Sequence, residues 1–152
     1  MKRNALILAQ TARILKLPVV LTSSMEEYAQ GPLLSELESI LPAEFAARIK
    51  RSGIVNAMDD KNFAAAVKAT GRKQLIVAGV TNDVCTVYPA LGLVREGFEV
   101  QVVADAGGSL RPMERGEVTL TTTNQLIAEF AGSWTTPEGG QLVRVLMTAL
   151  RG

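Results

Sequence analysis

The sequence predicts an α/β protein, a three-layer α/β/α sandwich with a mostly parallel sheet, and three observations support this. Apolar strand-like runs alternate along the chain with segments whose apolar residues recur at helical spacing. A strand, a helix and a strand follow one another over 74–79, 84–96 and 98–104, so these strands are parallel and joined by a right-handed crossover. The length of 152 residues suits one domain with a real core, over 1–152.

Four elements are predicted before this βαβ unit. They are a helix over 4–16, a buried strand over 18–22, a short helix over 33–41 and a helix over about 61–70. Pro18 is tolerated because it begins its strand, and Pro42 should stop the third element. Asp59 or Asp60 can cap the fourth. The stretch over 43–58 contains only strand-like pieces around Gly53.

The elements after the βαβ unit follow a Gly-rich loop over 105–116. A strand over 118–122 should precede a helix that Asn124 caps and that runs through Phe130. The last helix starts at Thr136, with a capping hydroxyl, a proline in the first turn and an early acid.

The bulk composition excludes several function classes. A net charge of +1 gives no general attraction to nucleic acid or to an anionic membrane surface. No apolar run reaches the length of a membrane span. The apolar start of the chain is interrupted by Gln10, Arg13 and Lys16, so it does not read as a signal peptide. A single cysteine cannot form an internal disulfide, and we expect a cytoplasmic protein.

The chain contains no histidine. This excludes every Ser–His or Cys–His catalytic pair within the chain and every metal site with a histidine ligand. One cysteine also cannot build a structural zinc site, and Gly107–Gly108 matches no phosphate-binding fingerprint. We therefore expect no metal and no other cofactor. Any base for a nucleophile must be a carboxylate or a lysine, or must come from elsewhere.

Cys85, the one cysteine, lies where a strand should end and a helix should begin. A thiol at a helix N-terminus meets unpaired backbone N–H groups and the positive end of the helix dipole. Both favour the thiolate, which is the nucleophilic form. The alternative is a small buried hydrophobic residue, because free cysteine is among the most buried residue types. Both interpretations stay open at this point.

Three segments should share one rim, since ligands bind beyond the carboxyl ends of parallel strands. They lie at 22–24, 79–85 and 105–109. Asp105 is an acid or base there, or it caps the next turn or bonds backbone amides. Lys50 and Arg51 are either a solvated pair or a source of positive charge that favours the thiolate.

The run over 71–85, GRKQLIVAGVTNDVC, resembles the nucleophile segment of the isochorismatase-like cysteine hydrolases, and of their YcaC-like branch in particular. The resemblance covers about residues 3 to 135. Five further stretches support it by order and spacing: LPVVLTSS at 17–24, GPL at 31–33, RSGIVNA at 51–57, EGFEV at 96–100 and VADAGGS at 103–109.

This resemblance implies a Rossmann-like fold, a Cys–Asp–Lys triad and a small-molecule substrate with an amide or related C–N bond, hydrolysed through a covalent thioester. It implies that Cys85 is the nucleophile, that a cis peptide joins Val80 to Thr81, and that the protein forms a homo-oligomer. The positions that it implies for oxyanion or substrate binding are Val80, Thr81, Val84, Thr22, Ser23 and Asn56.

The sequence departs from the family pattern at three places. Nothing matches the aspartate of an Asp-x-Gln strand, which in the family precedes the first helix and lies in the middle of the sheet, so we expect an N-terminally shortened domain whose base is unassigned. The basic position corresponds to Arg51, with Lys50 adjacent, and arginine is a poor proton carrier. A helix usually found after Ser109 is reduced to about 112–116.

Two other functions stay open besides hydrolysis. A non-catalytic family member could act by binding or assembly, with partner subunits covering exposed strand edges. A lone reactive thiol could also respond to oxidants without any substrate.

Overall fold

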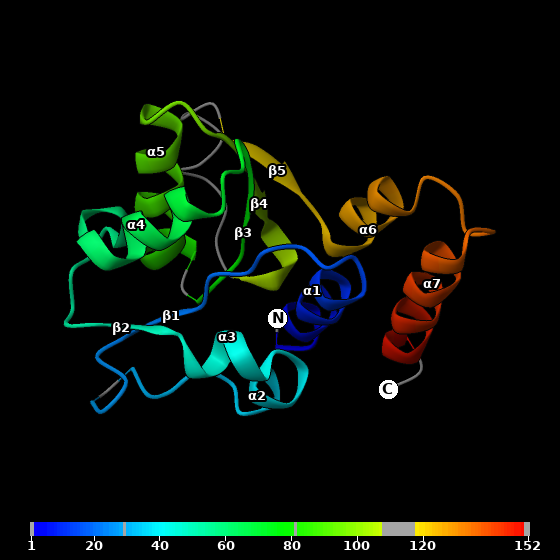
Figure 1. The fold of residues 1–152 in the computed structure, drawn as a ribbon, viewed down its shortest axis with the longest axis horizontal. Coiled ribbons are helices and arrows are strands. Elements are labelled where there is room, and N and C mark those ends of the chain that lie inside the picture. The colour runs from blue at the N-terminus through cyan, green and yellow to red at the C-terminus, as the bar shows by residue number, and fades with distance from the viewer. Residues whose placement is uncertain (1, 29, 81, 108–117, 151–152) are drawn as a thin grey trace.

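A computed structural model of the chain describes residues 2–28, 30–80, 82–107 and 118–150, and its helices and strands alternate along the chain (Figure 1). The elements in order are α1 Lys2–Ile14, β1 Thr22–Ser24, α2 Glu36–Ile40, α3 Pro42–Ala46, β2 Ile49–Arg51, η1 Ala57–Asp59, α4 Lys61–Ala69, β3 Gln74–Val77, η2 Asn82–Thr86, α5 Val87–Arg95, β4 Glu99–Val103, η3 Ala104–Ala106, β5 Thr119–Thr121, α6 Thr123–Ala131 and α7 Pro137–Leu150.

The strands form two parallel sheets. β1 pairs with β2, and β3, β4 and β5 pair in that order. The predicted βαβ unit is confirmed, because β3 and β4 are parallel neighbours joined through α5. Among the described residues, no backbone ladder joins β1 to β3.

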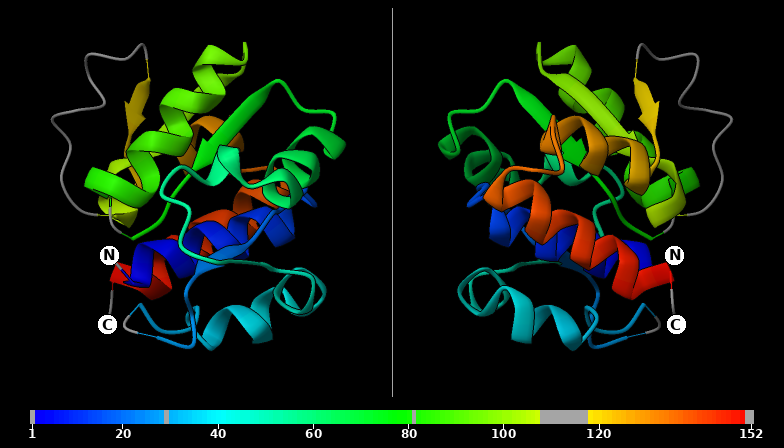
Figure 2. Two further views of the ribbon diagram at one scale, coloured as in Figure 1. Left: turned by 90° about the vertical axis from the view of Figure 1, so that its left-hand side faces the viewer. Right: turned by 90° about the vertical axis from the view of Figure 1, so that its right-hand side faces the viewer.

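Helices cover both faces of the three-stranded sheet, so the predicted three-layer α/β/α sandwich is confirmed (Figures 1 and 2). On one face, Val67 of α4 and Leu93 of α5 pack against Val102 of β4. On the other face, Leu126 of α6 packs against Val103. On this face Leu8 of α1 packs against the same residues, and α7 lies beside α1, in red and blue in Figure 2. Within the described part of the chain, no helix is long and apolar enough to cross a membrane.

The helix starts follow local side-chain chemistry. Asp60 caps α4, because its carboxylate accepts hydrogen bonds from the backbone N–H groups of Asn62 (2.9 Å) and Phe63 (3.1 Å). Thr136 caps α7, as predicted, with its hydroxyl accepting from the N–H of Gly139 at 3.0 Å. The predicted Asn124 cap is wrong, since Thr122 caps α6 instead.

Two predictions in the N-terminal half need correction. The helix predicted over 33–41 ends before Pro42, as predicted, but it is limited to α2, Glu36–Ile40. Pro42 also begins α3, where its missing N–H costs nothing, in a stretch for which only strand-like pieces were predicted. The strand predicted over 18–22 is shifted along the chain, because β1 covers Thr22–Ser24 and shares only Thr22 with the prediction. Its position is set by its partner among the described residues, β2, whose three residues pair with Thr22–Ser24.

Candidate functional site

Cys85 lies in the π-helical turn η2, which continues directly into α5. Its thiol is free and half-buried. Single π turns are often found at functional sites. Behind the turn, the buried Thr86 hydroxyl lies over Gly79, so close that a Cβ at Gly79 would come within 3.2 Å of it. Glycine at this strand end therefore lets the helix start against the sheet.

Arg51 is the last residue of β2, and its side chain is buried, with 6% of the residue exposed. Its Nε donates to the Thr22 hydroxyl at 3.0 Å, and its Nη1 donates to the Ile54 carbonyl at 2.7 Å. The Thr22 hydroxyl in turn donates to the Ile49 carbonyl at 2.8 Å. These contacts hold the guanidinium in one position.

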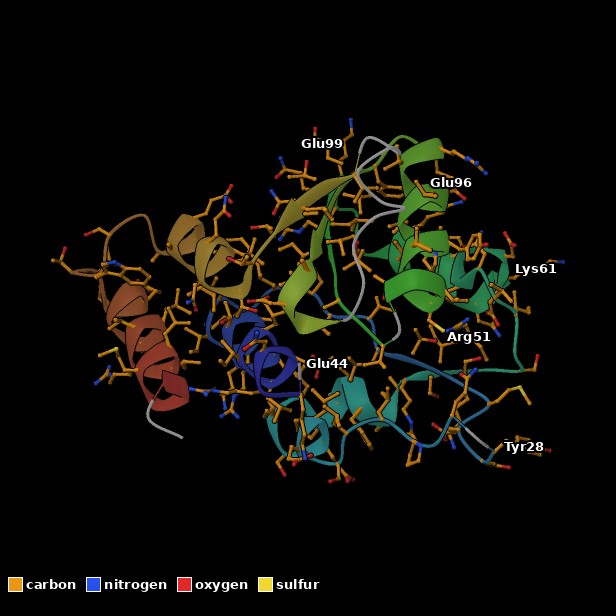
Figure 3. All side chains as sticks on the ribbon, turned by 180° about the vertical axis from the view of Figure 1, so that it is seen from behind. Tyr28, Glu44, Arg51, Lys61, Glu96 and Glu99 are labelled. Atoms are coloured by element: carbon orange, nitrogen blue, oxygen red, sulfur yellow. The ribbon has the colours of Figure 1, made fainter. Side chains whose placement is uncertain are left out.

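None of the ion pairs in the described part of the chain includes Arg51, so its hydrogen bonds go to neutral acceptors. A buried cation without a counterion is costly unless an anion completes the site. In the view of Figure 3, Arg51 is drawn near the N-terminal end of α5, which is the end away from Glu96. This is the end that follows Cys85 in the chain.

Lys50 is directed elsewhere, because neighbouring residues of a strand point to opposite faces. It is exposed, and its ammonium pairs with the Glu26 carboxylate at 2.5 Å. Arg48 holds the same carboxylate through two hydrogen bonds of 3.1 Å, and the Ser23 hydroxyl donates to it at 2.7 Å. The structure therefore brings Arg51 together with Thr22, and Lys50 together with Ser23 through Glu26.

These partners, the Arg48 guanidinium first and then Lys50 and Ser23, lower the pKa of Glu26 from 4.5 to about 2. Because folding lowers this pKa, the ionised Glu26 carboxylate contributes to the free energy of unfolding. This contribution is fully present above pH 4.5 and is lost as the pH falls towards 2.

We predict that, as the pH falls from 4.5 to about 2, the free energy of unfolding decreases less for a Glu26→Gln variant than for the parent. Urea unfolding at a series of pH values measures this, and parallel curves for the two proteins would contradict it.

The turn after Arg51 depends on Gly53, whose φ of +100° suits glycine. A Cβ there would meet the Sδ of Met25 at 2.9 Å. Met25 itself has a φ of +47°, and its N–H donates to the Arg51 carbonyl at 2.9 Å. Sequence reasoning missed this packing and the Glu26 network, because no local pattern signals contacts between segments more than twenty residues apart.

Asn56 has local partners. Its side chain accepts from the N–H of Met58 at 3.1 Å, donates to Asp59 at 3.0 Å and packs against Gly92 of α5. It therefore anchors the turn η1 to α5. Val80, which precedes η2, and Val84, which lies within η2, are both exposed. Thr81, the Val80–Thr81 bond and residues 112–116 lie outside the described residues.

Asp105 bonds a backbone amide, as one of its interpretations expects, and this amide lies in α6 and not in the next turn. Its carboxylate accepts from the N–H of Thr123 at 2.9 Å and from the Thr123 hydroxyl at 2.7 Å, while its carbonyl accepts from the Asn4 amide at 3.0 Å. It thus ties β4 to α6 and α1. In the described part of the chain, no three His, Cys, Asp or Glu side chains gather as metal ligands.

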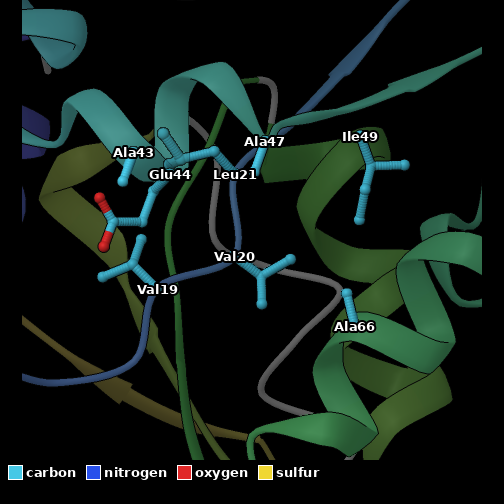
Figure 4. Close-up of a pocket in the computed structure, with 8 residues that line it drawn as sticks. All are labelled: Val19, Val20, Leu21, Ala43, Glu44, Ala47, Ile49 and Ala66. Atoms are coloured by element: carbon cyan, nitrogen blue, oxygen red, sulfur yellow. The ribbon is translucent and has the colours of Figure 1, made fainter.

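A cavity of about 310 Å³ lies away from Cys85 (Figure 4). Its lining is apolar except for one carboxylate, and consists of Val19, Val20, Leu21, Ala43, Glu44, Ala47, Ile49 and Ala66. It is at the small end of the range for ligand pockets.

A protein-family model and a curated protein both match most of this chain. The model of the isochorismatase domain family matches residues 1–133. The probable hydrolase YcaC of Escherichia coli K12 is 46% identical over 114 residues, which are 75% of this chain and 54% of that protein. The chain therefore spans about half the length of this curated relative.

Two solved structures are similar in fold and sequence. The YcaC structure from Escherichia coli, described as an octameric hydrolase of unknown specificity, has a TM-score of 0.86 at 37% identity, and covers 99% of this chain and 81% of that chain. The YcaC structure from Pseudomonas aeruginosa, with hexane-2,5-diol and covalent acrylamide, has a TM-score of 0.87 at 37% identity. This match covers 99% of this chain and 79% of that chain.

Proposed function

This chain belongs to the isochorismatase family, and on that premise we propose that it hydrolyses a small amide or related C–N bond through a thioester on Cys85. One observation carries the proposal. The buried guanidinium of Arg51 has no carboxylate partner among the described residues, and the view of Figure 3 draws it near the helix end that follows the one thiol of the chain.

In the proposed reaction, the Cys85 thiolate attacks the carbonyl carbon, and the carbonyl oxygen takes up the negative charge. Backbone N–H groups at Val84 and Cys85 stabilise that oxyanion. The C–N bond then breaks, the amine leaves with a proton, and a thioester remains. Water cleaves the thioester, which releases the carboxylic acid and restores the thiol.

We propose Arg51, and not Lys50, as the group that stabilises the thiolate, because Lys50 is neutralised by Glu26. The general base is unassigned. Glu26 is unsuitable, since its pKa of about 2 makes it a weak base at neutral pH. Asp105 is already engaged by Thr123.

The covalent acrylamide in the Pseudomonas aeruginosa structure supports an electrophile-accepting site in that relative. Acrylamide is an amide that also alkylates thiolates, so it is a direct probe of this chain. We predict that acrylamide modifies Cys85 faster than it modifies free N-acetylcysteine at pH 7, as followed by peptide mass spectrometry. A Cys85 rate equal to or below that of N-acetylcysteine would contradict an activated nucleophile.

A second function, self-association, is favoured by the apolar residues around the nucleophile turn. Val80, Val84 and Tyr88 are 62%, 40% and 50% exposed. Val84 and Tyr88 are four residues apart in one continuous helical segment, so they share a face. Since the Escherichia coli relative is octameric, we propose that this face contacts a second copy. Light scattering tests it, and a stable monomer would count against it.

A further inference from the structure

Thr22 and Arg51 lie on the same face of the β1–β2 pair. The parallel register places Thr22 opposite Ile49 and Ser24 opposite Arg51, so Arg51 is two residues beyond the partner of Thr22. Residues two apart on a strand point to the same face. The Arg51 side chain therefore reaches back along the pair, and its Nε donates to the Thr22 hydroxyl at 3.0 Å.

The hydrogen-bonding capacity of the Thr22 hydroxyl is already used. An arginine side chain has only N–H donors, so the hydroxyl oxygen must be the acceptor towards Arg51. The one hydroxyl proton is donated to the Ile49 carbonyl at 2.8 Å, and the Ser23 carbonyl at 3.4 Å is a longer alternative for the same proton. A hydroxyl stabilises an oxyanion by donating this proton. Thr22 therefore has no proton to offer to a substrate.

The Thr22 hydroxyl is one of two anchors of the Arg51 guanidinium. The other is the Ile54 carbonyl, which accepts from Nη1 at 2.7 Å. Contacts at two different nitrogens fix the plane of a rigid group. Because only 6% of Arg51 is exposed, removing the Thr22 hydroxyl would leave a buried N–H without an acceptor. That state is costly, so the guanidinium should move towards another acceptor.

We propose that Thr22 is a positioning residue, which acts on Cys85 through Arg51 and binds neither the oxyanion nor the substrate. Its hydroxyl keeps the Arg51 charge in the place where that charge stabilises the thiolate. This inference rests on the proposed function, in which Arg51 is the group that stabilises the thiolate. It replaces the binding role that the family resemblance implies for Thr22.

The test measures the rate at which iodoacetamide alkylates Cys85 in the full chain over a series of pH values. Thr22→Val removes the hydroxyl, so it should slow the reaction at pH 7 about threefold and move the pH–rate profile to higher pH. Thr22→Ser keeps the hydroxyl and should react as the parent does. In an Arg51→Met background, Thr22→Val should cause no further slowing, because the guanidinium that transmits its effect is absent.

Thr123→Val is the matched control for the loss of a buried hydroxyl. The Thr123 hydroxyl donates to Asp105 at 2.7 Å, at the start of α6 and away from the β1–β2 pair. Its removal should lower stability in urea without changing the alkylation of Cys85.

The Nε–H signal of Arg51 in an NMR spectrum gives a second readout, which needs no variant. It should exchange slowly with water in the parent, since this N–H is buried and bonded to Thr22. Rapid exchange in the parent would contradict the inference even if Thr22→Val did not fold.

The outcomes separate this inference from the proposed function. If Arg51→Met slows alkylation but Thr22→Val does not, Thr22 has no positioning role and the Arg51 assignment stands. Slowing by Thr22→Ser or by Thr123→Val as large as that by Thr22→Val, or equal slowing by Thr22→Val with and without Arg51, would also overturn the inference alone. If Arg51→Met leaves the alkylation rate unchanged, the Arg51 assignment fails and the role of Thr22 fails with it.

Discussion

Replacing Cys85 by alanine is expected to lower the hydrolysis of any amide that the chain turns over by at least about a thousandfold. The physical reason is that no covalent intermediate can form without the sulfur, and the chain has no second cysteine and no histidine to replace it. The unfolding midpoint should change little, because the side chain is small and half-buried.

A screen of small amides, with ammonia or amine release as the readout, measures this loss. Trp134→Phe, a conservative change at an exposed residue before α7, serves as the control for purification and handling. Turnover that persists in Cys85→Ala would remove the hydrolase assignment. If the parent turns over nothing while the thiol is unreactive, the binding or assembly function gains support.

Replacing Arg51 by methionine is expected to slow alkylation of Cys85 at neutral pH about tenfold, because a positive charge near the sulfur stabilises the thiolate, which is the form that reacts. Stability should fall as well, since the Thr22 hydroxyl and the Ile54 carbonyl lose their donor. Two measurements separate these effects. The pH dependence of the alkylation rate reports the influence of the Arg51 charge on Cys85, and urea unfolding reports the loss of the hydrogen bonds that Arg51 makes.

Lys50→Met provides the comparison within the same strand. Its ammonium pairs with Glu26, so its removal should slow alkylation of Cys85 less than the removal of Arg51 does. If both substitutions slow the alkylation of Cys85 equally, the effect comes from the general positive charge of this region, and the assignment of Arg51 as the thiolate-stabilising residue is wrong.

Elements whose signals are local were predicted well from the sequence. The strands at 74–79 and 98–104 correspond to β3 and β4, because apolar runs between glycines and turns define them without distant contacts. The α4 start at Asp60 and the α7 start at Thr136 followed from capping chemistry.

Features that depend on contacts between distant segments were not predictable. The strand predicted over 18–22 is shifted to β1, Thr22–Ser24, because pairing with β2 sets its position and no local pattern defines the extent of β2. The choice between Lys50 and Arg51 requires knowledge of which face of β2 is buried, and three residues are too few for a period-two pattern to decide this. The Glu26 network likewise joins residues far apart in sequence.

Mass spectrometry of the chain quenched during amide turnover detects the proposed thioester itself. The acyl part of the substrate is expected on the peptide that contains Cys85, and this adduct should decay at the rate of product release. Steady turnover with Cys85 unmodified at every time point would contradict it.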